Sequence, residues 1–139
     1  MTDEYTLIES APDEADYLHL RRASGLTPKS PEQARPALAG GWAACHVRHT
    51  SGETVAMGRV IGDGGWYFHL VDMAVLPDHQ RRGLGDRVLS HLLDVIRRDA
   101  PPGAYVSLMA DPPGRRLYER HGFVESAPHS VGMVLAPGT

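Results

Sequence analysis

Two polar side chains interrupt an apolar run of the sequence, and both could move a proton. The run covers residues 68–76, is rich in Val and Leu and stops at Pro77, which predicts a strand buried on both faces. His69 titrates near neutral pH and therefore suits general base catalysis. Asp72 is an acid inside the run, and a buried carboxylate is rare unless it is paired or used in chemistry. Simple alternation places the two side chains on opposite faces of the strand, unless a β-bulge changes the parity.

Each of these residues also has a structural interpretation. His69 could be a hydrogen-bonded histidine of the sheet, and Asp72 could bond a backbone N–H group or an arginine. A metal site is not indicated, because His46 and His49 would point to opposite faces of one strand. The sequence has no Gly-x-Ser-x-Gly segment, so a hydrolase triad has no nucleophile elbow.

A glycine-rich turn follows the predicted strand and opens a helix. Residues 80–85 read Gln-Arg-Arg-Gly-Leu-Gly, and apolar residues then recur with helical spacing as far as Ile96. Two glycines let a ligand approach the backbone, and the N–H groups of a helix N-terminus suit a phosphate. The turn lacks the Gly-Lys-Ser/Thr ending of a P-loop, and Val88 stands where a dinucleotide fingerprint needs its third glycine. A tight turn that simply uses two glycines is the alternative.

The spacing Gln80-x-x-Gly83-x-Gly85 resembles the acetyl-CoA signature Gln/Arg-x-x-Gly-x-Gly/Ala of GNAT acyltransferases. In that family the signature follows a strand that ends in Val-x-Pro, as residues 75–77 do here. Residues 117–123 resemble the family's Leu-Tyr-x-x-x-Gly-Phe motif. Two motifs in the right order are more specific than either alone. The resemblance covers about half the chain and implies a single GNAT domain over residues 1–139 that uses acetyl-CoA.

The resemblance implies how the acetyl donor is held. Backbone N–H groups at the strand end would hold the pantetheine arm and face the thioester oxygen, and the turn would hold the phosphates. Asp111 departs from the asparagine of many members, because it keeps an acceptor but loses the amide donor. One of the two arginines of the turn could equally be solvated. The residues expected to bind the cofactor are Met73, Ala74, Val75, Gln80, Arg81, Arg82, Gly83, Leu84, Gly85, Asp86, Asp111 and Tyr118.

The same resemblance implies an acid and a base for acetyl transfer to an amine. Tyr118 holds the motif position of the tyrosine that protonates the leaving sulfur in many members, although its ring could instead pack in the core. His69 lies fourteen residues before Gly83, which matches the glutamate base of the histone-modifying branch. Asp72 is the second candidate base. A water chain replaces the base in many members, so this alternative stays open.

The acceptor is expected to be a primary amine of a small molecule, attacked directly in a ternary complex. By resemblance, Leu26, Thr27, Pro28 and His69 would line its pocket, although an ordinary connection between two helices explains the loop equally well. A protein lysine or N-terminal acceptor and a non-catalytic CoA-binding module are the alternative functions. The oligomeric state is open, with a homodimer among the options.

Length, net charge and cysteine content reduce the number of classes to which this protein can belong. A chain of 139 residues can bury a core as one domain without a metal or disulfide. A formal net charge of -3 argues against a nucleic-acid partner. Cys45 is the single cysteine, which fits a reducing cytosol. We recognise neither a leader segment nor a long apolar run, so we expect neither export nor membrane insertion. We therefore expect a cytoplasmic protein.

The elements that position these residues predict a mixed α/β (α+β) fold. Three antiparallel strands lead into the glycine-rich turn and its helix, and the next strand must then run parallel to the third. The GNAT fold matches this pattern: a mostly antiparallel central sheet, a splayed parallel pair, and helices on both faces. Strands are expected over residues 5–9, 42–49, 53–61, 68–76, 104–110, 123–126 and 131–136, and helices from Ser10, Ser30, Leu84 and Asp111.

Overall fold

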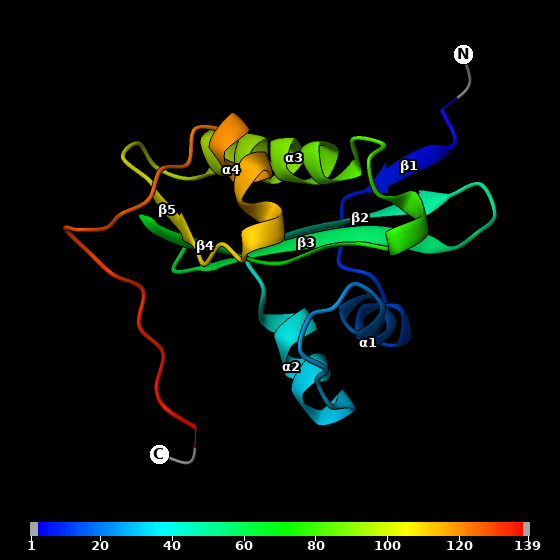
Figure 1. Cartoon of the computed structure of the whole chain (residues 1–139). Coiled ribbons are helices and arrows are strands. Elements are labelled where there is room, and N and C mark those ends of the chain that lie inside the picture. The colour runs from blue at the N-terminus through cyan, green and yellow to red at the C-terminus, as the bar shows by residue number, and fades with distance from the viewer. Residues whose placement is uncertain (1–2, 138–139) are drawn as a thin grey trace. The chain divides into compact units, whose positions relative to one another are not determined.

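The computed structural model describes residues 3–137, and the chain divides into two compact units between Leu108 and Met109. The first unit holds a five-stranded sheet of order β1-β2-β3-β4-β5, antiparallel except for the parallel pair β4–β5. Helices α1 and α2 lie on one face of this sheet and α3 on the other (Figure 1). The predicted mixed sheet with helices on both faces is confirmed, whereas the single domain stays a prediction. The strands are β1 Tyr5–Ile8, β2 Ala43–His49, β3 Thr54–Gly62, β4 Tyr67–Val75 and β5 Tyr105–Leu108, and the helices are α1 Glu14–Ala23, α2 Pro31–Gly40, α3 Leu84–Asp99 and α4 Arg115–Arg120, with 3-10 turns at Pro77–His79 and Pro112–Gly114.

The two N-terminal helices begin with clear caps. The helix expected from Ser30 is α2, and Ser30 and Gln33 form a capping box at its start, in which the Ser30 hydroxyl accepts from the Gln33 N–H at 3.2 Å. The prediction that α1 begins at Ser10 is wrong. Its N-cap is Asp13, which accepts from the Asp16 N–H at 2.8 Å. Pro12 disfavours helical geometry at the residue before it, so the helix starts only after the proline.

Helix α3 packs along the sheet through one apolar face. Its buried residues are Leu84, Val88, Leu89, Leu92, Leu93 and Ile96, the stripe expected from the sequence. The approach is close at Gly58 of β3, where an added Cβ would lie 2.7 Å from both Met73 Sδ and Val88 Cγ1. Glycine at this position lets the helix, and with it the glycine-rich turn, sit tightly against β3 and β4.

Strand β4 contains a β-bulge at Asp72. Between the pairs Ala74↔Met57 and Val71↔Arg59 the strand carries one residue more than β3, and Asp72 has a positive φ of 59°. The bulge inverts the alternation of side chains along the rest of the strand.

The bulge places His69 and Asp72 on one face of the sheet. Arg59 lies opposite Val71 and reaches the Ala37 carbonyl of α2, so this face is the one that α1 and α2 cover. His69 is two residues before Val71 and shares that face. Asp72 bonds to Tyr17 of α1 and so points the same way. Simple alternation would have separated the two candidate bases.

The second unit contains α4 and no strand among its described residues. The helix expected from Asp111 begins as a 3-10 turn at Pro112 and becomes α-helical at Arg115, and Asp111 makes no side-chain cap. Gly122 follows α4 with a φ of 91°, as a C′ glycine does. The predicted strands over residues 123–126 and 131–136 are wrong. Apart from the half-buried Phe123, their large apolar side chains are exposed, with Met133 at 90%, and the Ser130 N–H bonds the Ser126 carbonyl in a turn. A β-rich composition forms a strand only with a hydrogen-bonded partner.

Candidate functional site

The turn before α3 has the geometry of an anion site. Gly83 is the N-cap, with a φ of 78°, and an added Cβ there would meet nothing within 4 Å. Glycine is therefore favoured by the left-handed backbone and not by crowding. The helical ladder starts with the Arg87 N–H bonded to the Gly83 carbonyl at 3.0 Å, so the N–H groups of Leu84 and Gly85 precede it and point out of the helix end. This end of α3 suits a phosphate.

The side chains of the turn have different roles. The Gln80 amide donates to the Val75 carbonyl at 3.1 Å and ties the turn to the end of β4. Arg82 donates to the Tyr5 hydroxyl at 3.1 Å and lies 3.9 Å from Glu4, so it is held against β1. Arg81 is exposed on a backbone with a φ of 64°. Of the two arginines, only Arg82 has a hydrogen bond or ion pair with another of the described residues.

Strand β4 extends well beyond its partner β5. The parallel pairing covers Tyr67 to Leu70, and β4 continues for five residues to Val75. Residues 73–75 pair with β3 on one side. On the other side, the pairing with β5 has already ended at Leu70. Its second edge can therefore bond an extended ligand as a neighbouring strand would.

His69 is held by a side chain of the neighbouring strand. Its Nδ1 lies 2.8 Å from the Ser107 hydroxyl, and the two residues are direct partners in the β4–β5 register. Partial burial lowers the pKa of His69 below its ordinary value. The imidazole is therefore neutral at pH 7, which is the form that can accept a proton.

Asp72 lies in a buried ion-pair network. Its carboxylate accepts from Arg21, from Arg59 Nε at 2.7 Å and from the Tyr17 hydroxyl at 2.7 Å, and its side chain is 4% exposed. Burial, and next the hydrogen bond to Asp72, raise the pKa of Tyr17, which keeps its proton. Because both carboxylate oxygens are occupied, this geometry favours the structural interpretation of Asp72 over a role as base.

The same network holds the predicted acceptor loop. Arg21 donates to the Thr27 carbonyl from Nε at 2.9 Å, and the Leu26 N–H bonds the Arg21 carbonyl at 2.9 Å. Arg59 donates to the Ala37 carbonyl at 2.8 Å. Asp72 thus links the bulge of β4 to both N-terminal helices, and it fixes the backbone of the loop that contains Pro28.

Tyr118 and Asp111 belong to the second unit. The Tyr118 ring lies edge-on to Phe123, with centroids 6.1 Å apart, and an added Cβ at Gly114 would lie 3.0 Å from the ring. Burial, and to a lesser extent the charge of Asp111, raise the pKa of Tyr118. The phenol therefore stays protonated at neutral pH and can act as a donor.

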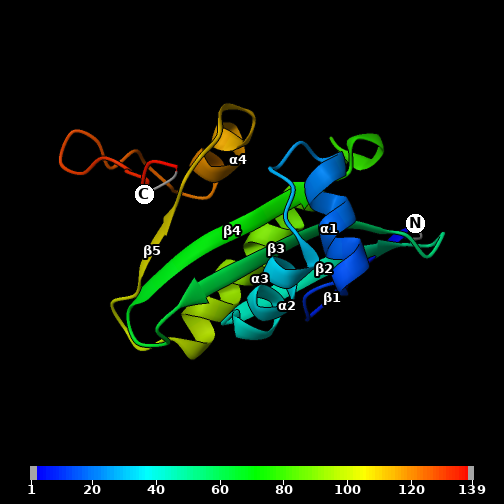
Figure 2. The ribbon, with the colours of Figure 1, turned by 90° about the horizontal axis from the view of Figure 1, so that it is seen from below.

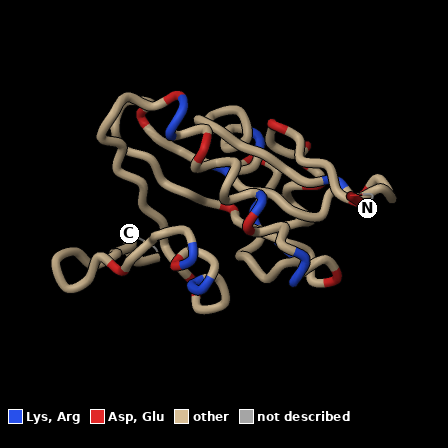
Figure 3. Tube along the Cα trace, turned by 90° about the horizontal axis from the view of Figure 1, so that it is seen from above, with Lys and Arg blue, Asp and Glu red and all other residues tan. Residues whose placement is uncertain are grey.

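Several other features bear on the chemistry of the chain. Acidic and basic residues are interspersed along the trace (Figure 3).

Nowhere in residues 3–137 do three or more His, Cys, Asp or Glu side chains come together as a metal site. Among the described helices, none combines the length and apolar composition needed to cross a bilayer. Burial raises the pKa of Cys45 to about 12, so its thiol is a poor nucleophile.

Sequence reasoning missed the partners of the candidate bases. Arg59 interrupts an apolar strand as Asp72 does, and two opposite charges in adjacent buried strands could have indicated a pair. Ser107 could have been found only from the register of β4 against β5. Tyr17 and Arg21 come from a distant helix, and no local pattern identifies them.

Comparisons with known proteins agree on the fold and the family. The family described as "Acetyltransferase (GNAT) domain" matches residues 41–125, which include β4, the turn and Tyr118. A "Probable Acetyltransferase" of unknown function from meticillin-resistant Staphylococcus aureus is 34% identical, with a TM-score of 0.89 over 95% of this chain and 98% of that one. A search of curated proteins gave no match.

Two enzymes with named acceptors share the fold at lower identity. Glucosamine-6-phosphate N-acetyltransferase from Arabidopsis thaliana is 19% identical, with a TM-score of 0.69 over 94% of this chain and 98% of that one. The ribosomal-protein-S18-alanine N-acetyltransferase from Escherichia coli is 22% identical, with a TM-score of 0.72 over 88% of this chain and 80% of that one. Together with the two sequence motifs and the parallel β4–β5 pair, the family match leads to one conclusion: the chain belongs to the GNAT family of N-acetyltransferases, which use acetyl-CoA as donor.

Proposed function

We propose that the protein transfers an acetyl group from acetyl-CoA to a primary amine of a small molecule by direct attack in a ternary complex. The observation that carries this proposal is the edge of β4 at Met73 to Val75 that no other strand of the described residues pairs, which leads to the phosphate-type end of α3. An extended pantetheine arm can bond that edge, and the diphosphate suits the N–H groups of Leu84 and Gly85. The single cysteine fits a reducing cytoplasm, where we expect the reaction to run.

In this proposal the chain's own residues move two protons. An alkylamine has a pKa of about 10 and is mostly protonated at neutral pH, so His69 takes a proton from it. The amine nitrogen then bonds the acetyl carbon, and the carbon–sulfur bond breaks. Tyr118 gives its proton to the departing sulfur, and the second proton that the nitrogen loses as it becomes an amide returns to the Tyr118 phenolate. Cys45 is unsuited to carry the acetyl group, since its thiol is buried with a pKa of about 12, and this favours direct transfer.

We assign Asp72 a positioning role in place of a proton-transfer role. Its two arginine partners hold the Thr27 carbonyl and the end of α2. The acceptor loop is then attached to the same bulge that orients the end of β4. Donor and acceptor sites would in this way keep a fixed separation.

Thermal unfolding with and without acetyl-CoA tests the donor site, with ATP and NAD as controls. A ligand at 100 times its Kd adds about 2.7 kcal/mol to stability, which corresponds to several degrees in Tm for a chain of this size. We expect a shift with acetyl-CoA or CoA alone. An acceptor screen by thiol release then identifies the amine.

Two glycines, the N-cap of α3 and one in the loop after this helix, offer a matched pair of variants. Gly83 and Gly103 have φ values of 78° and 90°, and an added Cβ meets nothing within 4 Å at either position. Alanine should therefore cost each about 1–2 kcal/mol of backbone strain. We expect both variants to lose similar stability, and only Gly83→Ala to lose the shift with acetyl-CoA. If the two variants keep equal shifts, the turn is not the donor site.

A further inference from the structure

A pair of tyrosine rings lies beside His69. Tyr67 and Tyr105 are direct partners at the start of the parallel strands, with ring centroids 5.3 Å apart and exposures of 43% and 48%. His69 and Ser107 form the pair two residues further along, so all four side chains lie on one face of the sheet. Figure 2 shows that the starts of β4 and β5 extend beyond the area covered by α1 and α2. The rings therefore form an exposed continuation of the candidate acceptor site.

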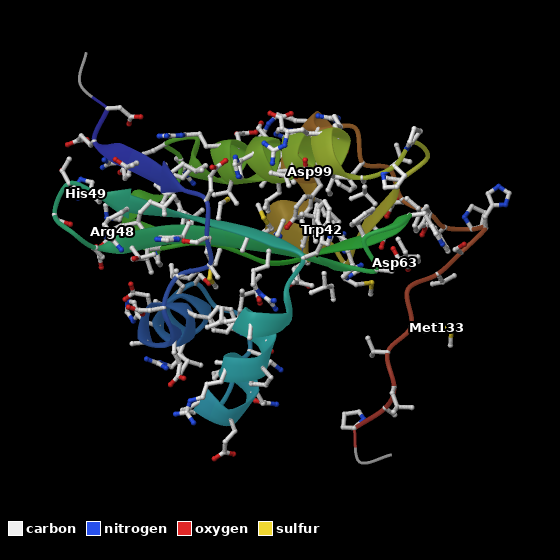
Figure 4. All side chains as sticks on the ribbon, turned by 180° about the vertical axis from the view of Figure 1, so that it is seen from behind. Trp42, Arg48, His49, Asp63, Asp99 and Met133 are labelled. Atoms are coloured by element: carbon white, nitrogen blue, oxygen red, sulfur yellow. The ribbon has the colours of Figure 1, made fainter. Side chains whose placement is uncertain are left out.

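A carboxylate lies at the same end of the sheet. Asp63 Oδ1 accepts from the N–H groups of Gly65, Trp66 and Tyr67 at 2.8, 3.0 and 3.1 Å. These bonds lower the pKa of Asp63, which is therefore ionised at neutral pH. Figure 4 shows Asp63 at the opposite end of the sheet from Arg48 and His49.

Rings and carboxylate together favour a positive ligand. The face of a tyrosine ring attracts an ammonium group, and a carboxylate at the same end of the sheet adds to that attraction. The arginines of this face, Arg21 and Arg59, are turned inward to Asp72, with side-chain exposures of 12% and 8%. A phosphate-bearing or carboxylate-bearing acceptor would meet Asp63 at this end of the site.

We propose that Tyr67, Tyr105 and Asp63 bind a second cationic group of the acceptor, so that the acceptor is a diamine or a longer polyamine. This inference rests on the proposed function, because His69 marks the place of the reacting amine. Two residues of strand separate His69 from Tyr67, a distance of about 6.6 Å. A short diamine such as putrescine can span it, with one amine at the base and the other over the rings.

Calorimetric titration of amines into the protein saturated with CoA tests this inference without relying on turnover. The probes are putrescine, butylamine, which has the same carbon chain and one ammonium group fewer, and glucosamine 6-phosphate. We expect each ring to strengthen the binding of the second ammonium group about threefold, so that putrescine binds about tenfold more tightly than butylamine. Glucosamine 6-phosphate should bind most weakly.

Side-chain variants locate the preference. Tyr67→Leu and Tyr105→Leu should each reduce the preference for putrescine about threefold, whereas Tyr67→Phe and Tyr105→Phe keep the ring and should retain it. Arg48→Ala is an exposed control at the other end of the sheet and should change nothing. Both leucine variants replace half-exposed side chains, and their thermal unfolding checks that they fold.

The outcomes are distinct. If CoA itself does not bind, the proposed function fails and this inference fails with it. If CoA binds but putrescine and butylamine bind equally, or no amine binds, the inference alone is overturned. A preference that survives both leucine variants, or tighter binding of glucosamine 6-phosphate, also overturns it.

Discussion

Replacing Asp72 by asparagine should destabilise the fold more than any other single-atom change in this site. Asparagine has the same shape and tolerates the positive φ of 59° at this position, so the backbone cost is unchanged. What changes is the charge, since Arg21 and Arg59 lose their common partner while remaining 12% and 8% exposed. Removing one partner of a buried ion pair costs about 3–5 kcal/mol.

The expected loss can be measured directly. At about 3–4 °C for each kcal/mol in a chain of this size, Asp72→Asn should lower Tm by roughly 10–20 °C. Urea unfolding should give a lower midpoint with an unchanged slope. Glu14→Gln makes the same chemical change in the exposed pair with Arg35, whose side chain is 67% exposed, and should cost less than about 1 kcal/mol.

The comparison also separates the two interpretations of Asp72. If Asp72 is a positioning residue, the asparagine variant loses stability first, and it keeps measurable turnover at temperatures where it is folded. If Asp72 is also the base, the variant should lose its turnover even at temperatures where it is folded. A loss of stability no larger than that of Glu14→Gln would refute the reasoning about the buried network.

Three further variants test other parts of the site and fold. His69→Gln should lower kcat by about 10²–10⁴-fold while the affinity for CoA is kept. In the wild type, kcat should rise with pH and level off, and the midpoint of the rise should lie below the ordinary pKa of 6.5, because burial lowers the pKa of His69. A midpoint above 6.5 would contradict His69 as the base. Tyr118→Phe should lower kcat while CoA binding, measured by calorimetry, stays unchanged; equal turnover would assign the sulfur's proton to another donor. Gly58→Ala would place a Cβ 2.7 Å from Met73 Sδ and 2.9 Å from Leu92 Cδ1, and should cost about 1–3 kcal/mol in urea unfolding; an unchanged midpoint would show that the side chains move aside.

Much of the fold could be predicted because its signals are local. The apolar run of β4, the stripe of α3 and the glycine turn between them are each visible within a few residues of sequence. The crossover rule then makes β4 and β5 parallel. The cap of α2 follows from Ser30 and Gln33 alone.

What the sequence could not predict depends on distant partners. The parity of β4 changes at Asp72, and an extra residue in a strand leaves no mark in composition or periodicity. The partners of Asp72 lie 51 and 55 positions away on α1. The apolar residues 131–135 have strand composition, yet they form no strand, because pairing requires a neighbour that composition does not reveal.

The extension of β4 beyond β5 divides the strand into two halves that, in the proposed function, would meet their ligands in different ways. Main-chain groups look the same to a ligand whatever the side chain, so a donor bonded through the backbone of Met73 to Val75 leaves those side chains able to vary with the packing of α3. In the first half, Tyr67 and His69 would meet the acceptor through their side chains. Exchanges there could redirect the enzyme to a new amine while the donor half stays intact. A library randomised at the first half alone would be the economical source of new acceptor specificities on this scaffold.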